Sequence, residues 1–412
     1  MLDLRQAVHD LYVENSQSVD HLQYTVPSNS SYPYQWFWDS CFHAIVWNHF
    51  DPLRAQAELD ALVFRQHANG FIGHVTYWQP REVLAIDWGI PHTSSLIQPP
   101  VLAYAIWRTY EASGDKEWLA TIYPKVAAFY NYIITERDVR NVHLYGLVNP
   151  DESGEDNAPK FDDALGLPPK HDAQENTKRR YALFDAHRNC NYRAACTSTH
   201  FWVEDVAFNT YLVWNLDILS DIAYSIGNKK DAQRWRSLAM KTKAAMRKLM
   251  FHNGKYVSLS GSSGIPVTTD SWDQFLPLLA GLYTQSEAHQ LVQNHLLDKK
   301  RYWLPHGIPT VAPTDPGYAP DEPEWGEAWQ HPDWRGAIWM VPHWCLYHGL
   351  RRYGFITEAE VIRDKSVALI EAQGFRENYH PLTGVGMGAE GFTWSGLTID
   401  MQPHKAASTG NS

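Results

Sequence analysis

The sequence predicts an all-α protein whose helices form hairpins arranged in a closed ring. Two observations lead to this prediction. Apolar residues recur at the i, i+3, i+4, i+7 spacing of a single helix face in about twelve segments of the chain. The breaks between these segments alternate between short polar turns and long irregular stretches. A ring of antiparallel helix pairs has this alternation, with the short turns at one end and every long loop gathered at the other.

The predicted helices follow one another as pairs. They cover residues 2–15, 39–49, 51–66, 94–113, 115–137, 203–226, 229–251, 271–282, 284–298, 334–354, 357–373 and 393–402. Gly114 and Asp115 separate one pair, since glycine ends a helix and aspartate caps the next one. Similar breaks occur at Gly227-Asn228, Thr284-Gln285-Ser286 and Gly354 to Thr357. The pattern after Trp394 breaks off early, so the twelfth helix is expected to be short or irregular.

Long irregular segments fall between the pairs. They cover residues 16–38, 67–93, 138–201, 252–270, 299–332 and 374–392. Loops of this length are uncommon inside a compact chain unless they carry function. The longest, 138–201, is predicted to be a cap-like loop at the mouth of the ring. No change in composition marks a linker, so residues 1–412 are predicted to form a single domain.

Composition and charge exclude several classes of partner. The 412 residues are 44% apolar and 20% charged, as in an ordinary globular protein, and the formal net charge is −11. An acidic chain without a cluster of lysine and arginine argues against nucleic acid or an anionic membrane as partner. The N-terminal residues have no apolar signal core, and no stretch approaches the length of a membrane span. A small molecule is therefore the expected partner, and the oligomeric state is not predicted.

The cysteines indicate a reducing compartment. Cys41, Cys190, Cys196 and Cys345 are scattered along the chain, which predicts reduced thiols in a cytoplasmic protein. Cys190 and Cys196 lie in a segment rich in histidine and arginine, but no second cysteine pair completes a zinc site. Neither a metal nor a cofactor is expected.

Aromatic residues are unusually frequent. They form 13% of the chain, with 18 tryptophans and 22 tyrosines, and such side chains suit pockets for amphipathic ligands such as sugars. The densest group is Tyr32-Pro-Tyr34-Gln-Trp36-Phe37-Trp38-Asp39-Ser40. This motif predicts a platform on which a sugar stacks, with Asp39 accepting from its hydroxyls. A core plug with an N-capping aspartate remains the alternative.

Acidic residues gather in the segment Asn149-Pro-Asp-Glu152-Ser-Gly-Glu155-Asp156-Asn157-Ala-Pro159. It lacks the ligand spacing of a calcium-binding EF-hand loop. A carboxyl group crowded by other carboxylates and aromatic rings has a raised pKa, which suits a general acid near neutral pH. The segment is therefore a candidate source of an acid catalyst.

Two later segments combine aromatic residues with charge. Asp333-Trp334-Arg335-Gly336-Ala-Ile-Trp339 stands where a helix is predicted to start, so its tryptophans belong either to the core or to a pocket. Glu377 precedes a glycine-rich turn, and Phe392-Thr-Trp394 follows that turn. Glycine lets the backbone approach a ligand closely. Taken alone, a glutamate in such a loop is usually just solvated.

Together these segments resemble glycoside hydrolase family 63 and its relatives, the trehalases and glucoamylases. The resemblance runs from about Tyr32 to Trp394, on the motifs ESGEDN, WRGAIW and ENYHPLTGVGMG with FTW. Its compact length is most similar to the bacterial hydrolases of mannosylglycerate and glucosylglycerate. One departure is Ala337, where the family usually has proline. The resemblance implies an (α/α)6 toroid, which agrees with the twelve predicted helices.

The resemblance also implies roles for individual residues. Asp156 would be the general acid and Glu377 the general base, with Glu152 and Glu155 as competitors for the acid and Glu390 for the base. The substrate-binding residues would be Tyr32, Trp36, Trp38, Asp39, Tyr77, Gln98, Trp334, Arg335, Trp339 and Tyr379.

The implied reaction is hydrolysis of a small α-linked glucoside or mannoside with inversion at the anomeric carbon. Inversion requires the two carboxyl groups to be roughly 6.5–9.5 Å apart. The basic residues of 160–201 would suit an aglycone with a carboxylate, such as glycerate, although a solvated cap explains them equally. The alternatives are an α-glucosidase for neutral disaccharides or short oligosaccharides, and a sugar-binding toroid without activity.

Overall fold

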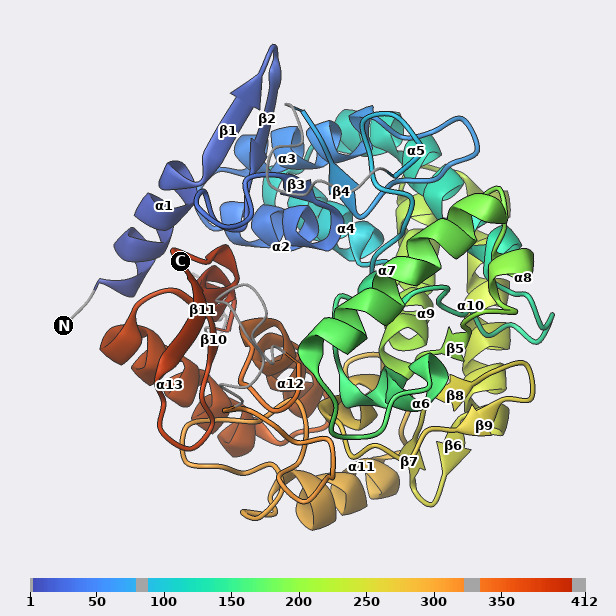
Figure 1. Ribbon diagram of the computed structural model, residues 1–412. Coiled ribbons are helices and arrows are strands. Elements are labelled where there is room, and N and C mark those ends of the chain that lie inside the picture. Colours follow the sequence, from blue (N-terminus) through green and yellow to red (C-terminus); the bar gives the residue numbers. More distant parts are fainter. Residues whose placement is uncertain (1–2, 79–87, 322–333, 402–412) are drawn as a thin grey trace.

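The helices follow one another around a ring in chain order, clockwise from α1 in Figure 1. The computed structural model describes residues 3–78, 88–321 and 334–401. Helix α1 (Leu4–Glu14) contacts the last helical segment, η6 (Thr393–Ile399), and this contact closes the ring. The predicted all-α ring is therefore confirmed.

Within the described residues, six helical segments form an inner layer in which each touches the next and the last touches the first. In order they are α2 (Phe37–Trp47), α4 (Leu102–Ser113), α9 (Val206–Ser225), η3 (Trp272–Leu278), α12 (Met340–Arg352) and η6. Every residue of α2 is buried, as expected for a helix that is apolar on nearly all sides.

The outer layer packs against the inner one as hairpin partners. Its members are α1, α3 (Pro52–Phe64), α5 (Lys116–Glu136), α10 (Lys229–Leu249), α13 (Ile356–Gln373) and α11 (Gln285–Leu291), which continues into the π-helix η4 (Val292–Leu296). Helix α10 buries Ala232, Trp235, Ala239 and Met246 at helical spacing and turns its basic residues outward. Two layers of helical segments thus account for the predicted pairs.

The predicted turns carry the expected end signals. Gly114 has a φ of +69°, the left-handed conformation that glycine adopts without strain. The Asp115 carboxylate accepts from the amide of Trp118 at 2.9 Å and caps α5. Thr284 and Glu287 form a reciprocal capping box at the start of α11.

The prediction of a loop over residues 138–201 is wrong. This segment contains the 17-residue helix α7 (Ala173–Asn189), the short helices α6 (Asp162–Leu165) and α8 (Ala194–Thr197), and the 3₁₀ turns η1 (Pro150–Ser153) and η2 (Pro159–Phe161). Helix α7 buries few of its residues and is polar on most sides, so the sequence shows no apolar stripe there. It crosses the near face of the ring in Figure 1.

Two predicted helix starts and two predicted helix types also differ. Helix α4 begins at Leu102 rather than at residue 94, because Pro99 and Pro100 have no amide hydrogen to donate. Helix α12 begins at Met340 rather than at residue 334. The predicted helices 271–282 and 393–402 are the 3₁₀ segments η3 and η6, and the second confirms the expectation of an irregular last helix.

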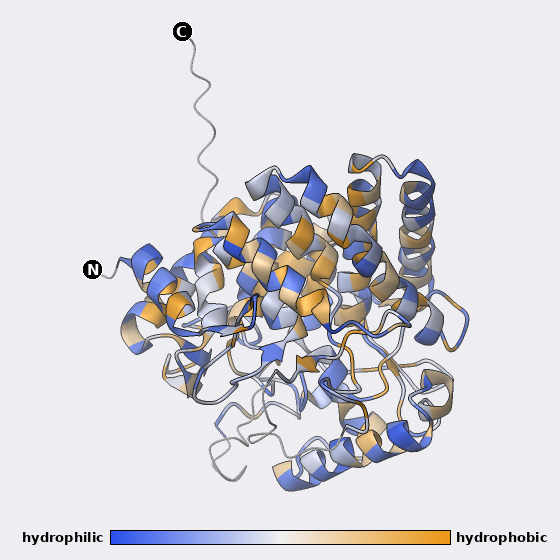
Figure 2. Ribbon diagram, turned by 90° about the horizontal axis from the view of Figure 1, so that it is seen from above, coloured by the Kyte–Doolittle hydropathy of each residue, from blue (hydrophilic) through white to orange (hydrophobic). Residues whose placement is uncertain are grey.

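Short antiparallel strands, which the sequence analysis did not predict, occur in the long loops. The pairs are β1 (Ser16–Val19) with β2 (Leu22–Thr25), β3 (Gln35–Trp36) with β4 (Val75–Thr76), β6 (Phe251–His252) with β7 (Lys255–Tyr256), and β10 (Arg376–Tyr379) with β11 (Gly386–Glu390). A small three-stranded sheet joins β5 (Val203–Glu204), β8 (Leu259–Ser260) and β9 (Ile265–Pro266). In Figure 2 the ring helices gather on one side and the long connections on the other. No helix in the described ranges is both long and apolar enough to cross a membrane.

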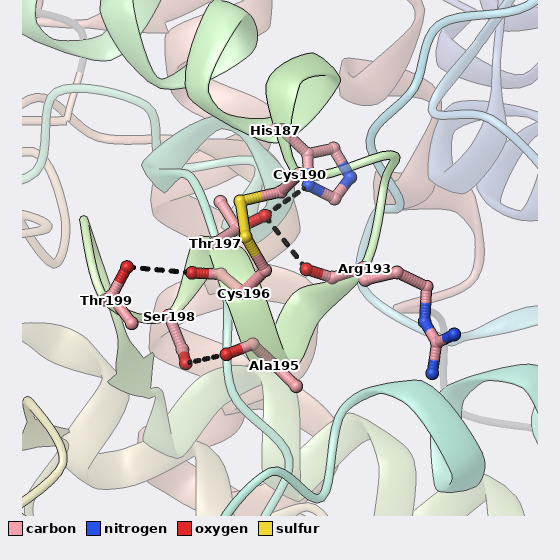
Figure 3. Close-up of a disulfide and its surroundings, with 8 residues drawn as sticks. All are labelled: His187, Cys190, Arg193, Ala195, Cys196, Thr197, Ser198 and Thr199. Atoms are coloured by element: carbon pink, nitrogen blue, oxygen red, sulfur yellow. Dashed lines mark hydrogen bonds between the residues drawn. A yellow bond between two sulfur atoms is a disulfide. The ribbon is translucent and has the colours of Figure 1, made fainter.

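The prediction that all four cysteines are reduced is also wrong. Cys190 and Cys196 form a disulfide, because the turn between α7 and α8 brings their Cα atoms to 5.5 Å (Figure 3). Cys41 and Cys345 are free and buried. The cytoplasmic location, which reduced thiols would favour, stays a prediction.

Candidate active site

Asp39 lies where strand β3 enters the inner helix α2. Its Oδ1 accepts from the indole Nε1 of Trp394 at 2.6 Å, and the rings of Trp38 and Trp394 meet edge to face at 5.0 Å. Burial raises the pKa of Asp39 to about 6, although His43 and the Trp394 hydrogen bond act in the opposite direction. One end of the chain thus supplies a carboxylate that the other end holds in place.

Glu377 stands at an irregularity in the β10–β11 hairpin, where the register shifts between Arg376 and Asn378. Such a bulge redirects a side chain out of the regular alternation. Tyr32 Oη donates to Glu377 Oε1 at 2.6 Å, and the amide of Ala389 donates to Oε2 at 2.7 Å. Burial raises the pKa of Glu377, and these two hydrogen bonds oppose the rise because they stabilise the ionised form.

Asp156 follows the 3₁₀ turn η1. Its side chain is 48% exposed, so water reaches the carboxyl group. Arg180 Nη1 lies 3.6 Å from Asp156 Oδ2. Burial and the charges of Asp151 and Glu377 raise the pKa of Asp156 to about 7, and Arg180 lowers it.

The charge of Glu377 acts on two other carboxyl groups of the candidate site. It raises the pKa of Asp39 and of Asp156, so Glu377 lies within electrostatic reach of both aspartates. Both aspartates lie more than two hundred residues before Glu377 in the sequence, and the shared role of the three residues in one site stays a prediction.

A continuous aromatic wall joins these carboxyl groups. The rings of Trp334 and Trp339 stack in parallel with centroids 4.3 Å apart, and Trp339 contacts Trp394 at 5.3 Å. Phe392 contacts Trp394 at 5.4 Å and Tyr32 at 5.6 Å. The amide of Trp334 donates to the side chain of Asn157 at 3.1 Å, so the wall reaches the residue that follows Asp156.

Gly154 lets the acidic loop, residues 149–159, approach the ring of Trp38. It has a φ of +70°, and a Cβ atom there would lie 2.3 Å from the Trp38 ring. Only glycine allows the loop to approach the indole this closely.

Buried side-chain contacts of Glu152 and Glu155 hold the acidic loop in place. Glu152 is fully buried and forms two hydrogen bonds with Arg137, at 2.6 and 2.8 Å. Glu155 pairs with Lys160 at 3.0 Å, and the same ammonium group contacts Asp205 and Asp273. The side chains of both competitors for the acid role thus contact buried cations inside the protein.

Glu390, the competitor for the base, lies on the surface. Its side chain is 79% exposed and pairs with Arg376 at 2.6 Å. An exposed carboxylate in an ion pair lacks the enclosed surroundings of Glu377.

Three of the predicted binding residues form hydrogen bonds with backbone groups near the wall. Arg335 is fully buried; its guanidinium bonds Asp162 and donates to the carbonyl of Asn157 at 3.0 Å. Tyr379 is also fully buried, and its hydroxyl donates to the carbonyl of Gly374. Gln98 Oε1 accepts from the amide of Trp38 at 3.1 Å. These three side chains hold the backbone of the acidic loop 149–159, of the segment that leads into β10, and of α2, respectively.

The remaining predicted aromatic residues, Trp36 and Tyr77, contact other aromatic side chains. Trp36 contacts Tyr32 at 5.9 Å and His74 at 5.4 Å, both edge to face. The Tyr77 hydroxyl accepts from the indole of Trp88. His74 and Trp88 were not predicted, because a single histidine or tryptophan in a loop carries no recognisable pattern.

Asp151 and Arg180 are the main residues that the sequence analysis did not assign to the site. Asp151 belongs to the acidic motif, whereas Arg180 was only one of many cations in a segment expected to be a loop. Its position on a helix beside Asp156 depends on the tertiary placement of α7. In the part of the chain that the structure describes, no group of three or more histidine, cysteine, aspartate or glutamate side chains has a metal-binding arrangement.

Comparison with known proteins gives the same assignment over nearly the whole chain. The model of the mannosylglycerate hydrolase MGH1-like glycoside hydrolase domain matches residues 32–395. A mannosylglycerate hydrolase of Thermus thermophilus is 32% identical and covers 90% of this chain and 94% of its own length. A glucosylglycerate hydrolase of Mycolicibacterium hassiacum is 24% identical and covers 89% of this chain and 91% of its own.

Solved structures agree with the ring architecture. A crystal structure of a Thermus thermophilus mannosylglycerate hydrolase in complex with Tris and D-glycerate has a TM-score of 0.85 at 30% identity, covering 97% of this chain and 99% of that chain. Neutral trehalase Nth1 of Saccharomyces cerevisiae shares the fold, with a TM-score of 0.63 at 15% identity, covering 93% of this chain and 74% of that one. The fold is therefore the (α/α)6 toroid of these enzymes. The chain belongs to the mannosylglycerate hydrolase MGH1-like family of glycoside hydrolases.

Proposed function

We propose that this glycoside hydrolase cleaves a small α-glycoside of glycerate with inversion, with Asp156 as the general acid and Glu377 as the general base. The observation that carries the proposal is the pairing of two differently held carboxyl groups on one aromatic wall. Asp156 has a pKa near 7 and can keep a proton at neutral pH. Glu377 accepts two hydrogen bonds that favour its ionised form.

In this mechanism Asp156 donates its proton to the glycosidic oxygen as the bond to the anomeric carbon breaks. A water molecule attacks that carbon from the opposite face, and Glu377 takes the proton that the water loses. Asp39, fixed by Trp394, is suited to accept from a sugar hydroxyl. The stacked rings of Trp334 and Trp339 offer an apolar face for the sugar ring.

The substrate class follows from the relatives. Several of them are mannosylglycerate hydrolases, one is a glucosylglycerate hydrolase, and the Thermus structure holds D-glycerate. The basic residues of 160–201 add little support, because Arg179 pairs with Glu175, Arg193 with Glu136, and Lys160 with three buried carboxylates. The choice of glycerate therefore rests on family membership rather than on an uncompensated positive loop.

A substrate panel tests the proposal. Mannosylglycerate and glucosylglycerate should be hydrolysed, and trehalose, kojibiose and maltose should be poor substrates. Activity on the neutral disaccharides alone would favour the α-glucosidase alternative, and failure on every α-glycoside would favour a sugar-binding protein. Proton NMR should detect the β-anomer of the sugar first, whereas initial release of the α-anomer contradicts inversion.

Two pairs of variants test the residues. Asp156→Asn and Glu377→Gln should each lower kcat by at least about a hundredfold. The matched controls Asp163→Asn, on the exposed face of α6, and Glu390→Gln, in the same hairpin as Glu377, should retain activity. Unchanged hydrolysis in Asp156→Asn or Glu377→Gln removes that residue from the mechanism.

A further inference from the structure

Arg180 of the cap helix α7 lies between two carboxylates of the acidic loop. Its Nη1 is 2.5 Å from Asp151 Oδ1 and 3.6 Å from Asp156 Oδ2. The side chains of Arg180 and Asp151 are each 12% exposed, so water screens this interaction only weakly. The guanidinium of Arg180 thus lies close to two carboxyl groups of unequal exposure. The more exposed one belongs to Asp156, the proposed general acid.

The surrounding residues hold this arrangement in place. The Nε of Arg180 donates to the side chain of Asn176 one turn earlier in α7, at 3.0 Å. Asn149 donates through Nδ2 to the carbonyl of Arg180 and accepts at Oδ1 from the amide of Asp151, each at 2.9 Å. A single asparagine therefore ties the cap helix to the turn that carries Asp151. The guanidinium is fixed from both sides before any substrate binds.

We infer that Asp151 and Arg180 are a positioning pair, which orients the Asp156 carboxyl and sets the pH at which it gives up its proton. The inference rests on the proposed function of Asp156. Arg180 attracts the ionised form of Asp156 and holds one carboxyl oxygen near the guanidinium, which leaves the other oxygen for the proton. Asp151 repels the ionised form and engages the closest nitrogen of Arg180, which limits that attraction.

The other groups around Asp156 act less directly. Burial is the largest cause of its raised pKa, followed by Asp151, with Arg180 opposing and Glu377 adding a smaller rise. The pKa of Tyr181, next to Arg180 on α7, is raised mainly by burial, and the charges of Asp151 and Asp156 add to the rise. Glu155 points to Lys160 on the far side of the loop. Asp151 and Arg180 are thus the two nearby charges with opposite effects.

The test uses the opposite signs of the two charges. In Asp151→Asn the repulsion disappears while Arg180 remains, so the pKa of Asp156 should fall. The alkaline limb of the profile of kcat against pH should therefore move about one unit to lower pH. In Arg180→Gln the attraction disappears while Asp151 remains, so the same limb should move about one unit to higher pH. The double variant should return close to the wild-type limb. Mannosylglycerate at saturating concentration is the substrate.

A second variant separates charge from orientation. Arg180→Lys keeps the positive charge but loses the planar fork, so its alkaline limb should stay near wild type while kcat falls about tenfold. The matched controls are Arg179→Gln, which breaks an exposed pair with Glu175 on the same helix, and Asp185→Asn, which is 76% exposed. Neither control should move the limb.

A direct titration tests the inference without turnover. The carbon-13 signal of the Asp156 carboxyl, assigned by its loss in Asp156→Asn, should titrate at lower pH in Asp151→Asn and at higher pH in Arg180→Gln. Shifts in the same direction, or no shift in either, overturn the inference. Full activity of Asp156→Asn would instead remove the proposed function and leave the titration result standing on its own.

Discussion

The indole Nε1 of Trp394 donates to Oδ1 of Asp39 across 355 residues of sequence, at 2.6 Å. The bond joins the last inner segment of the ring to the first and crosses the wall on which the sugar is proposed to stack. It is also one of the interactions that lower the pKa of the buried Asp39.

Trp394→Phe should therefore retain the fold but lose the orientation of Asp39. We expect kcat/KM to fall about tenfold to a hundredfold, because a buried hydrogen bond to a charged group contributes about 1.5–3 kcal/mol. Steady-state kinetics check this. The matched control is Trp118→Phe, which removes a similar indole–carboxylate bond to Asp60 on the outer layer. Equal losses in both variants would mean that the effect is structural.

Gly388→Ala should impair the proposed base. A Cβ atom at residue 388 would lie 2.5 Å from Glu377 Oε2, and the φ of +65° adds strain for any other residue. We expect kcat to fall at least about tenfold and the unfolding free energy to fall by about 1 kcal/mol.

The control for this clash is Gly261→Ala. Gly261 has a φ of +69° but no neighbouring atom within 4 Å. Urea unfolding should show a similar loss of stability in the two variants, with kcat reduced only in Gly388→Ala. Wild-type kcat in Gly388→Ala would contradict the close packing of the base strand.

Lys160→Met should destabilise the protein more at high pH than at low pH. Burial raises the pKa of Glu155 to about 8, and Lys160 is the group that opposes the rise. Because the folded pKa lies above the ordinary glutamate value of 4.5, ionisation of Glu155 costs stability as pH rises through that range. Without the ammonium group this cost grows, so the variant should lose about 3–5 kcal/mol at pH 8 and less at pH 5.

Urea unfolding at the two pH values measures this difference. Lys178→Met is the control, since Lys178 is 78% exposed and lies 3.7 Å from Glu175. A loss in Lys160→Met that does not depend on pH would mean that packing, rather than charge, dominates at this site.

Removal of the disulfide should loosen the end of the cap helix. Closing so short a loop restricts the unfolded chain by about 2 kcal/mol, so Cys190→Ser/Cys196→Ser should unfold at lower urea concentration. Cys196 is exposed, which makes the bond accessible to a thiol reductant. Hydrogen exchange should increase at the C-terminal end of α7. If the hydrogen-exchange rate at this end is the same in wild type, in reduced wild type and in the double variant, other contacts hold it. The hydrogen bond between His187 and Thr197 is one such contact.

The sequence predicts the ring because inner and outer helices carry different patterns. Helix α10 alternates buried and basic positions, and α2 is apolar throughout, so both are visible to a periodicity argument. Helix α7 is not visible, because it lies over loops and buries few residues. The 3₁₀ form of η3 and η6 is invisible for a different reason, since apolar spacing does not distinguish it from an α-helix over so few residues.

The candidate site is predictable where residues form compact motifs. Asp156 and Glu377 lie in such motifs, whose neighbouring residues contact the aromatic wall, whereas the catalytic roles of the two residues stay a prediction. Arg335 and Tyr379 belong to the WRGAIW and ENYHPLTGVGMG motifs but are fully buried. A motif thus includes residues that support a site as well as residues on its surface. Arg180 lies outside every motif and could not be assigned without the position of α7.

The meeting of η6 with α1 and α2 has a consequence for how the enzyme matures. Tyr32 and Asp39 lie near the beginning of the described chain, and their partners Glu377 and Trp394 lie near its end. A ribosome must therefore release the chain through Trp394 before both pairs can form, and contacts of such long range slow the final step of folding. Until that step, the early helices expose aromatic surface that the last inner segment later covers, so the nascent protein is vulnerable to aggregation at the proposed sugar site.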